Sequence, residues 1–306
     1  MVDRSGLDAR QAAAASPDRR PASVALLVAE LARTLDAAGV SEAQEEARDL
    51  ISAILDVPRH WPALHGSEAP SGALVAQARR AAVRRAAGAP LAYAVGRAAF
   101  RQFTLDVDER VLIPRPETEL LPELVLGMIA AAGGTAVDVG TGSGAIALAL
   151  AADGRFARVI ATDISADALV VARGNVAMLQ GALRTPVECR LGAGLAPVAG
   201  ERLRAVVSNP PYIAFGEVAA LPASVRDWEP PLALACAGDG LALTRALVRD
   251  AAGLLEPGGV LALEVDIRRA MLVAELVASH GAYAGVRIEL DLTGRERFVV
   301  ARREAH

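Results

Sequence analysis

Asn209-Pro210-Pro211-Tyr212 is the stretch of this sequence whose residue types are best suited to chemistry. It follows residues 205–208, a short apolar run typical of a buried parallel strand. Neither proline can donate a backbone N–H group, so the hydrogen-bond ladder of the strand has to stop here. The Asn209 side chain and the carbonyl group of Pro210 can then face a ligand. An ordinary turn at the end of a strand would use the same residues. The neighbouring sequence must therefore decide between a ligand-binding turn and a purely structural one.

A second candidate is the segment Gly140-Thr141-Gly142-Ser143-Gly144, which lies between an apolar run at 136–139 and a helical run at 145–150. Strand, glycine turn and helix in this order suit a ligand at the carboxyl end of the strand. Asp163 follows Gly140 by 23 residues and ends the next apolar run. A carboxylate there can accept both hydroxyls of a ribose. NAD and S-adenosylmethionine both satisfy this pattern, and Asp163 could instead cap a helix.

The elements before residue 90 are predicted to be helical. Val24, Leu27, Val28, Leu31 and Leu35 recur at helical spacing. A second helix is expected around residues 47–55 behind a capping box formed by Ser41 and Gln44, and a third at about 73–87. Residues 1–21 show no periodicity and are expected to be a disordered tail. We therefore predict a helical domain at 22–90.

Residues 91–116 are predicted to form a linker with a β-hairpin, because the alternating Phe103, Leu105 and Val107 are followed by Val111-Leu112-Ile113. From residue 117 onward, helical patterns alternate with short apolar runs. This alternation favours a mostly parallel sheet with helices on both faces over residues 117–306. The predicted strands are residues 135–139, 158–162, 187–191, 205–208, 260–265, 285–290 and 298–301.

Composition narrows the possible classes of protein. A length of 306 residues favours two domains, and charges interrupt the apolar stretches before they reach membrane-spanning length. Because the N-terminal segment also lacks the apolar core of a secretory signal, a cytoplasmic protein is predicted. Cys189 and Cys236 lack the spacing of a metal site, so no metal is expected. A net charge of −4 offers no general basic surface for nucleic acid. The cluster Arg79, Arg80, Arg84 and Arg85 is interpreted as a solvated helix face.

Several blocks together resemble the protein-(glutamine-N5) methyltransferases of the HemK/PrmC type, which modify peptide chain release factors. The main blocks, in family order, are Pro90-Leu91-Ala92-Tyr93, Val111-Leu112-Ile113-Pro114-Arg115-Pro116-Glu117-Thr118-Glu119, residues 138–144 and Asn209-Pro210-Pro211-Tyr212. Shorter matches are Trp228-Glu229-Pro230 and Gly238-Asp239-Gly240-Leu241. The resemblance covers nearly everything after the tail.

This resemblance implies a class I S-adenosylmethionine-dependent methyltransferase fold, with a Rossmann-like, mostly parallel seven-stranded sheet. The helical N-terminal domain would help to recognise a protein substrate, namely a release factor modified at the glutamine of its Gly-Gly-Gln motif. The implied cofactor-binding residues are Gly140, Thr141, Gly142, Ser143, Gly144, Asp163 and Asn209. Asn209, Pro210, Pro211 and Tyr212 would bind the glutamine, and Asn209, Pro210 and Tyr212 would act in catalysis.

The chain departs from the family pattern after the third predicted strand, where an acidic or serine residue followed by an aromatic is usual. Here the residues are Gly192-Ala193-Gly194-Leu195, which leaves the contacts to the adenine ring open. The roles of Arg115, Glu117 and Glu119 are also open, since they could shape the substrate entrance or form an ion-paired linker. Glu229 could order the segment after the Asn-Pro-Pro-Tyr turn or cap a helix.

Alternative functions use the same core residues. A related enzyme could methylate a glutamine of a ribosomal protein, or the amino group of adenine in nucleic acid. An enzyme that methylates adenine in nucleic acid would need basic and aromatic residues to bind its substrate, whereas this chain has 32 Lys+Arg, 36 Asp+Glu and 3% aromatic residues. A binding protein without turnover is a third possibility. We expect a monomeric enzyme with no direct contact to nucleic acid or membrane.

Overall fold

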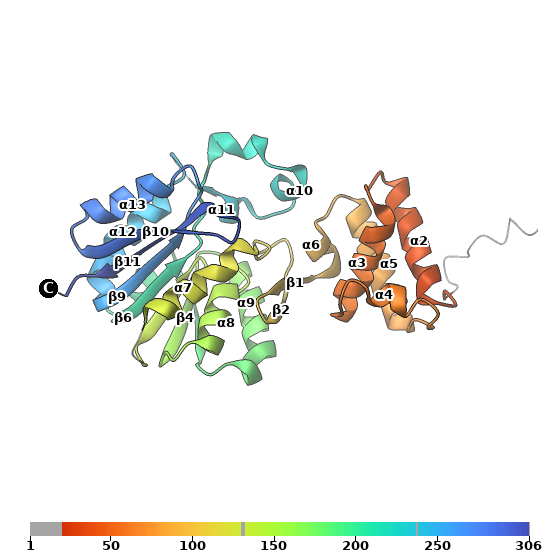
Figure 1. The fold of residues 1–306 in the computed structure, drawn as a ribbon, viewed down its shortest axis with the longest axis horizontal. Coiled ribbons are helices and arrows are strands. Elements are labelled where there is room, and N and C mark those ends of the chain that lie inside the picture. The colour runs from red at the N-terminus through yellow and green to blue at the C-terminus, as the bar shows by residue number, and fades with distance from the viewer. Residues whose placement is uncertain (1–19, 130–131, 237, 306) are drawn as a thin grey trace, which may run out of the picture. The chain divides into compact units, whose positions relative to one another are not determined.

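The structure is a computed structural model, and it describes residues 20–129, 132–236 and 238–305. The predicted disordered tail lies outside the described residues, except for its last two positions. Two compact units are present, the first ending at Val95 and the second beginning at Gly96. Figure 1 shows the chain coloured along its sequence.

The first unit is helical, as predicted. Its helices are α2 (Val24–Ala37), α3 (Ala43–Leu55), α4 (Trp61–Leu64), α5 (Gly72–Ala86) and α6 (Leu91–Val95). Helix α2 begins at a Ser23 cap, whose hydroxyl accepts a hydrogen bond from the Leu26 amide. The apolar positions predicted for α2 are all buried, and they pack with residues such as Leu50, Ile51 and Val75 in one core.

One prediction for this unit is wrong, and a second one holds only in part. Helix α3 has no capping box: its N-cap residue is Glu42, in a left-handed conformation with φ 53° and no side-chain hydrogen bond to the helix, so Ser41 stands one residue too early. In the arginine cluster, Arg80 and Arg84 are exposed, as predicted, but the other two members are half-buried. Arg79 Nε lies 2.6 Å from Glu30 Oε1 and Arg85 Nε lies 3.0 Å from Glu46 Oε2, so these two arginines join α5 to α2 and α3.

The second unit is built on the seven-stranded sheet that the sequence predicted. Its strands are β3 (Thr135–Val139), β4 (Arg158–Asp163), β5 (Val187–Leu191), β6 (Leu203–Ser208), β9 (Leu255–Glu264), β10 (Tyr283–Leu290) and β11 (Glu296–Arg303). The order is β10-β11-β9-β6-β3-β4-β5. The five strands from β9 to β5 are parallel, and β11 is antiparallel to both of its neighbours.

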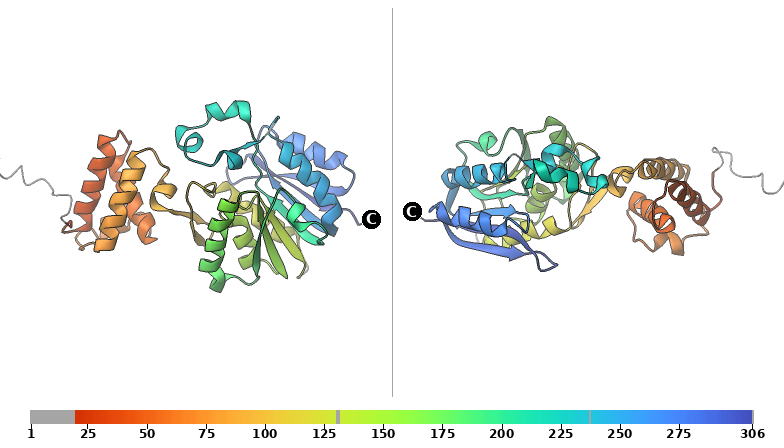
Figure 2. Two further views of the ribbon diagram at one scale, coloured as in Figure 1. Left: turned by 180° about the vertical axis from the view of Figure 1, so that it is seen from behind. Right: turned by 90° about the horizontal axis from the view of Figure 1, so that it is seen from above.

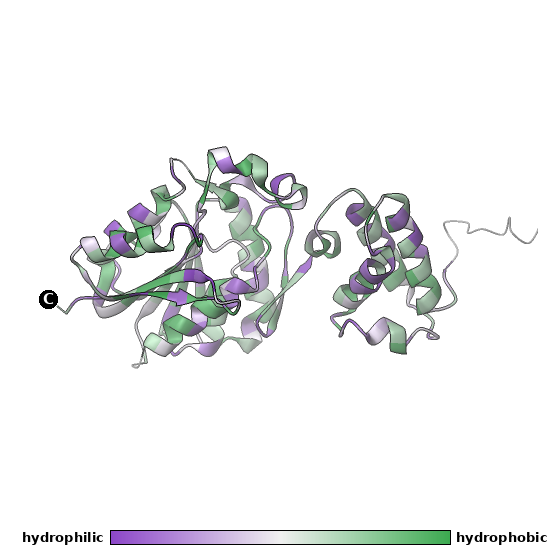
Figure 3. Cartoon of the chain, turned by 45° about the horizontal axis from the view of Figure 1, so that its top comes forward, coloured by the Kyte–Doolittle hydropathy of each residue, from purple (hydrophilic) through white to green (hydrophobic). Residues whose placement is uncertain are grey.

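Helices cover both faces of this sheet (Figures 1 and 2). They are α7 (Leu120–Met128), α8 (Ala145–Asp153), α9 (Ala166–Leu179), α12 (Ala242–Leu254) and α13 (Ala270–Ser279). Because alternate strand residues face opposite sides, Val137 packs in the core under α12 and α13, whereas Ala136 packs in the core under α7 and α8. Burial on both faces explains why the central strands are apolar along most of their length (Figure 3).

The hairpin before the sheet differs from the prediction. It pairs β1 (Arg97–Phe100) with β2 (Phe103–Asp106), whereas Val111-Leu112-Ile113 forms no strand. Pro114 and Pro116, which follow this segment, have no N–H group to donate to a strand ladder. The Ile113 amide instead donates to Glu229 Oε2 at 3.3 Å. Residues 111–113 are therefore a loop held by a side chain.

Short elements connect the parts of the second unit. The 3-10 helix η1 (Glu117–Glu119) precedes α7, while η2 (Gln180–Ala182) and η3 (Ala196–Val198) flank β5. The segment between β6 and α12 contains β7 (Ile213–Ala214), η4 (Phe215–Ala220), α10 (Ala223–Arg226), α11 (Pro231–Leu234) and β8 (Ala235–Cys236). Strands β7 and β8 pair in parallel, which closes this segment into a loop beside the end of β6.

Candidate active site

A cavity of about 320 Å³ opens at the carboxyl ends of the parallel strands. Gly140 follows β3, Asp163 ends β4, Gly192 follows β5 and Asn209 follows β6, and all four line the cavity. Open α/β sheets bind ligands at this edge, and the volume lies at the lower end of the usual range for small-molecule sites. Other lining residues are Arg110, Val111, Leu112, Val139, Gly142, Ile164, Ser165, Ala168, Ala193, Gly194, Pro211, Pro230, Leu232, Ala233 and Leu243.

The cavity therefore brings together two predicted groups of site residues. From the glycine segment and the next strand, Gly140, Gly142 and Asp163 reach the cavity, and from the turn after β6, Asn209 and Pro211 reach it. Thr141, Ser143, Gly144 and Pro210 are buried and Tyr212 is half-buried, and none of them is among the lining residues. The buried residues of segments 140–144 and 209–212 pack inside the protein and fix the backbone conformation of these segments.

The glycine segment is held by backbone groups and by Asp138. The amides of Gly140 and Thr141 both donate to the Thr162 carbonyl at 2.9 Å. Asp138 Oδ2 accepts from the Thr141 hydroxyl at 2.6 Å and from the Ala147 amide at 3.0 Å. Burial raises the pKa of the Asp138 carboxyl to about 7. Asp138 thus joins the loop to the first turn of α8, a role that sequence reasoning did not assign.

Asp163 is fixed in a position that faces the cavity. Its Oδ2 accepts from the Gly142 amide and its Oδ1 from the Ser165 amide, both at 2.9 Å. The alternative interpretation of Asp163 as a helix cap is wrong, because the N-cap of α9 is Ser165, whose hydroxyl accepts from the Ala168 amide. Each carboxylate oxygen retains a second lone pair, so Asp163 can still accept hydroxyl donors from a ligand.

The segment Gly192-Ala193-Gly194-Leu195, which departs from the family pattern, lines the cavity through its first three residues. Leu195 instead packs in the core under α12 and α13. The side chains of residues 192–194 are hydrogen atoms or a single methyl group, so these residues leave space along this side of the cavity. Together with the exposed Ile164 and the half-buried Leu243, they form an apolar wall suited to a planar ring.

The Asn-Pro-Pro-Tyr turn is packed tightly from behind. The Ser208 hydroxyl donates to the Val139 carbonyl at 2.7 Å, which joins the ends of β6 and β3. Gly240 has φ +85°, and a Cβ atom at this position would lie only 2.4 Å from the Tyr212 carbonyl oxygen. Only glycine meets both conditions. The Gly-Asp-Gly-Leu block at 238–241 therefore shapes the turn.

Asn209 is held by a buried hydrogen-bond chain. Its Nδ2 donates to Thr118 Oγ1 at 3.2 Å, and the Thr118 hydroxyl lies 2.7 Å from Glu264 Oε2. Thr118 comes from η1 and Glu264 ends β9, and both are buried. Burial raises the pKa of the Glu264 carboxyl to about 7. Sequence reasoning placed Thr118 in a signature block without a role and did not consider Glu264.

Arg115 and Glu229 connect two walls of the cavity. Arg115 Nη2 lies 2.6 Å from Glu229 Oε1, and the Glu229 side chain is 1% exposed. The same carboxylate accepts from the Ile113 amide. Of the two roles left open for Arg115, the ion-paired one is therefore present. It holds the loop that contains Val111 and Leu112 against the segment that contains Pro230.

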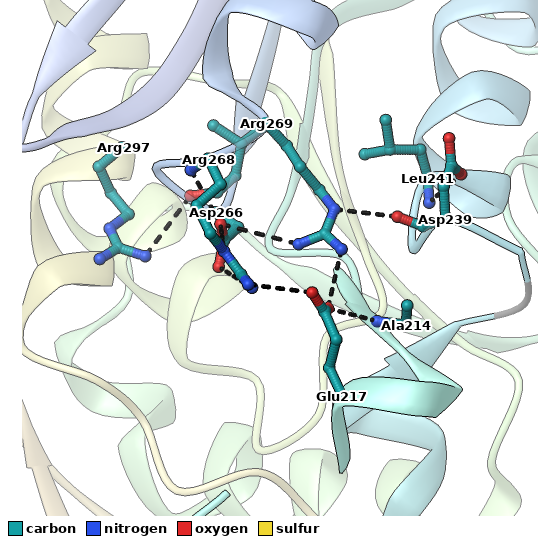
Figure 4. A network of polar contacts seen from close by, with 9 residues as sticks. Ala214, Glu217, Asp239, Leu241, Asp266, Arg268, Arg269 and Arg297 are labelled. Atoms are coloured by element: carbon teal, nitrogen blue, oxygen red, sulfur yellow. Dashed lines mark hydrogen bonds and ion pairs between the residues drawn. The ribbon is translucent and has the colours of Figure 1, made fainter. Parts of the chain in front are cut away.

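A polar network anchors the segment that follows Tyr212 (Figure 4). Glu217 accepts from the Ala214 amide at 3.0 Å, and it pairs with Arg268 at 3.0 Å and with Arg269 at 2.8 Å. Arg269 Nε also donates to the Asp239 carbonyl at 2.9 Å. The network thus ties η4 and the Gly-Asp-Gly-Leu block to the residues between β9 and α13.

Two further findings concern the described residues only. No group of three or more His, Cys, Asp or Glu side chains among them is placed to hold a metal ion. None of their helices combines the length and apolar character needed to cross a membrane.

Family profiles match both units of the chain. The profile described as PrmC N-terminal domain matches residues 27–96, and the profile described as Methyltransferase small domain matches residues 118–221. In solved structures, the catalytic domain of hMettl16 in complex with MAT2A 3′UTR hairpin 6 has a TM-score of 0.52 and 16% identity, over 77% of this chain and 83% of that one. At this identity the likeness shows the fold alone, and it agrees with the predicted class I methyltransferase fold.

Two curated relatives extend over most of the chain. A release factor glutamine methyltransferase of Moorella thermoacetica is 43% identical over 279 residues, which cover 90% of this chain and 97% of the relative. Another, from Cereibacter sphaeroides, is 42% identical over 268 residues, covering 88% and 94%. Identity at this level across nearly the full length of both sequences places the chain within the release factor glutamine methyltransferase family.

Proposed function

We propose that this protein uses S-adenosylmethionine to methylate the N5 atom of the glutamine in the Gly-Gly-Gln motif of peptide chain release factors. The observation that carries the proposal is the placement of Asn209. Its Nδ2 is engaged by Thr118 while the residue lines the same cavity as Gly140, Gly142 and Asp163. The relatives are named for release factors, which favours this substrate over ribosomal proteins or adenine in nucleic acid.

The cavity fits S-adenosylmethionine. Asp163 presents carboxylate oxygens for the two ribose hydroxyls, and residues 140–142 present backbone close to the ligand. Residues 192–194, Ile164 and Leu243 would receive the adenine ring. When bound, S-adenosylmethionine supplies a methyl group on a positively charged sulfur.

An amide nitrogen is a poor nucleophile because its lone pair is delocalised into the carbonyl group. In the proposed complex, Asn209 Oδ1 and the Pro210 carbonyl would each accept one N–H of the glutamine amide, and the nitrogen would be fixed with its lone pair directed at the methyl group. Orientation of this kind can lower a barrier by about 7–11 kcal/mol in favourable cases. The nitrogen would form a bond to the methyl carbon as the bond between that carbon and the sulfur breaks, which would leave S-adenosylhomocysteine as the neutral thioether product. The alkylated nitrogen would then lose one proton to solvent, so the turn needs no strong base.

Tyr212 and Pro211 complete the substrate side. Pro211 lines the cavity, and Tyr212 is half-buried. In the proposed complex its ring would pack against the plane of the amide. Burial, with the nearby Glu264 charge, raises the pKa of the Tyr212 phenol to about 12. The phenol therefore stays neutral at physiological pH, and its ring offers a face to a cation.

The helical unit at 27–96 is proposed to recognise the release factor, and the enzyme is proposed to act as a monomer without direct nucleic-acid contact. A cytoplasmic location is also proposed. Cys189 and Cys236 are both free thiols, which is usual in a reducing compartment.

Mass spectrometry can test this function. The protein is incubated with S-adenosylmethionine and a purified release factor, and the Gly-Gly-Gln peptide is sequenced by tandem mass spectrometry. We expect one methyl group on the glutamine, and a loss of rate of at least about 100-fold in Asn209→Ala. Calorimetry should show that Asn209→Ala still binds S-adenosylmethionine.

A release factor in which that glutamine is replaced by asparagine serves as the substrate control and should remain unmethylated. Methylation confined to a ribosomal protein or to nucleic acid would overturn the proposal. So would an Asn209→Ala variant with a near-normal rate.

A further inference from the structure

The hydrogen-bond chain Asn209–Thr118–Glu264 has a direction that can be worked out from its members. A threonine hydroxyl carries one proton and two lone pairs. An ionised glutamate can only accept, so the Thr118 proton is committed to Glu264 Oε2, 2.7 Å away. That length is within the normal range for an O–H···O hydrogen bond.

Only a lone pair of Thr118 then remains for Asn209. The group of Asn209 that faces Thr118 must therefore be the amino group, in agreement with the 3.2 Å bond from Nδ2. Its Oδ1 points away from Thr118, and among the described residues no hydrogen bond reaches this oxygen. An unpartnered amide oxygen at the cavity is an acceptor available to a ligand.

We infer that Thr118 and Glu264 are positioning residues, which select the amide orientation of Asn209 in which Oδ1 accepts the N–H of the substrate. Neither residue lines the cavity, and both are buried, so they act through Asn209. The inference rests on the proposed function, because it concerns the glutamine amide that Asn209 holds. A flipped Asn209 would present its amino group to a substrate N–H group, and the hydrogen bond that Oδ1 accepts from the substrate would be lost.

The charge of Glu264 controls this orientation. If Glu264 is protonated, its hydroxyl can donate to Thr118, the Thr118 proton can turn to Asn209 Oδ1, and the amino group then faces the cavity. The pKa of Glu264 is raised to about 7 chiefly by burial, and the carboxylate of Glu117 raises it further. Thr118, Arg297 and Arg115 act in the opposite direction, and Tyr212 is the remaining titratable group nearby. Turnover should therefore fall as the pH drops below about 7.

The test compares Thr118→Val, which keeps the shape but removes the hydroxyl, with Thr118→Ser, which keeps the hydroxyl. Thr118→Val should lower kcat for release-factor methylation by about 100-fold, as expected for a misplaced reacting group, with little change in the dissociation constant for S-adenosylmethionine. Thr118→Ser should recover most of the rate. Thr244→Val is the matched control, since Thr244 is 1% exposed and its hydroxyl has no hydrogen-bond partner among the described residues.

A second variant keeps the inference testable if Thr118→Val does not fold. Glu264→Gln can still accept from Thr118 but does not titrate, so its kcat should change much less between pH 8 and pH 6 than that of the unmodified protein. The inference is overturned if Thr118→Val keeps a normal kcat, or if Glu264→Gln shows the same acid limb as the unmodified protein. Failure of the unmodified protein to methylate a release factor would instead count against the proposed function.

Discussion

Residues 140–144 on one side of the cavity take their hydrogen bonds from nearby sequence, whereas residues 209–212 on the other side depend on distant side chains. Gly142 is held by Asp163, 21 residues away, and Ser143 by Asn175, 32 residues away. Asn209 is held by Thr118, 91 residues away, and Thr118 by Glu264, 146 residues away. The proposed cofactor side is thus a local motif, whereas the proposed substrate side is assembled from segments far apart in the sequence.

This difference predicts that the substrate side can be damaged from a distance while cofactor binding survives. The first test of this difference is the Gly240→Ala variant. Its Cβ atom would lie 2.4 Å from the Tyr212 carbonyl oxygen, so the turn must shift. We expect kcat to fall by about 100-fold while calorimetry shows S-adenosylmethionine binding within a few-fold of normal.

Gly238→Ala is the matched control. Gly238 also has a positive φ, of +69°, but a Cβ atom there would meet no atom within 4 Å. Backbone strain is therefore common to both variants, and only Gly240→Ala adds the clash. Equal losses of kcat in the two variants would mean that strain, and not the close approach to Tyr212, is responsible.

A second prediction concerns two buried carboxylates, Asp138 and Glu264. Asp138 holds the glycine segment, and Glu264 holds Asn209 through Thr118. The pKa of each is raised to about 7 by burial, above the ordinary values of 3.8 and 4.5. Between these values the folded state binds more protons than the unfolded state. The free energy of unfolding should therefore fall as the pH rises from about 4 to about 7, by a few kcal/mol. Urea unfolding at several pH values measures this slope.

Glu264→Gln and Asp138→Asn should each remove part of that slope. Because Asp138 accepts two hydrogen bonds and Glu264 one, Asp138→Asn carries the greater structural cost at low pH. A slope that is unchanged in both variants would show that other groups titrate in this range.

Prediction from sequence succeeded for the residues that are held by local contacts and failed for those that are held by distant side chains. The apolar runs predicted all seven strands of the sheet, since burial on both faces leaves a strong signal in the residues themselves. The glycine segment and Asp163 were predicted together because their spacing follows directly from one strand-turn-helix-strand unit. Thr118 and Glu264 were not found because a hydrogen bond across 146 residues leaves no local pattern.

The hairpin shows a second reason for failure. Val111-Leu112-Ile113 is apolar enough for a strand, but its conformation is decided by Glu229, which binds the Ile113 amide and Arg115. A buried carboxylate from a distant segment overrode the local β preference. The same ion pair is the subject of the third prediction.

Glu229→Gln should destabilise the second unit without changing the residues that line the cavity. Arg115 is 30% exposed and Glu229 1% exposed, so breaking the pair costs less than the loss of a fully buried one. We expect a loss of about 2 kcal/mol, seen as a Tm lowered by roughly 4–8 °C in calorimetry. Asp250→Asn, which breaks the exposed Arg249–Asp250 pair, should leave the Tm almost unchanged.

The smallest expected effect concerns Asp163, on the proposed cofactor side of the cavity. Asp163→Asn can accept only one of the two backbone hydrogen bonds from Gly142 and Ser165, because its amino group replaces one acceptor. S-adenosylmethionine should bind about 10-fold more weakly, equal to about 1.4 kcal/mol, while kcat at saturation stays near normal. Asp167→Asn, the same change in the exposed first turn of α9, should have no effect. A lower saturated kcat in Asp163→Asn would show that the two sides of the cavity are coupled, since a defect confined to the cofactor side can be overcome by concentration.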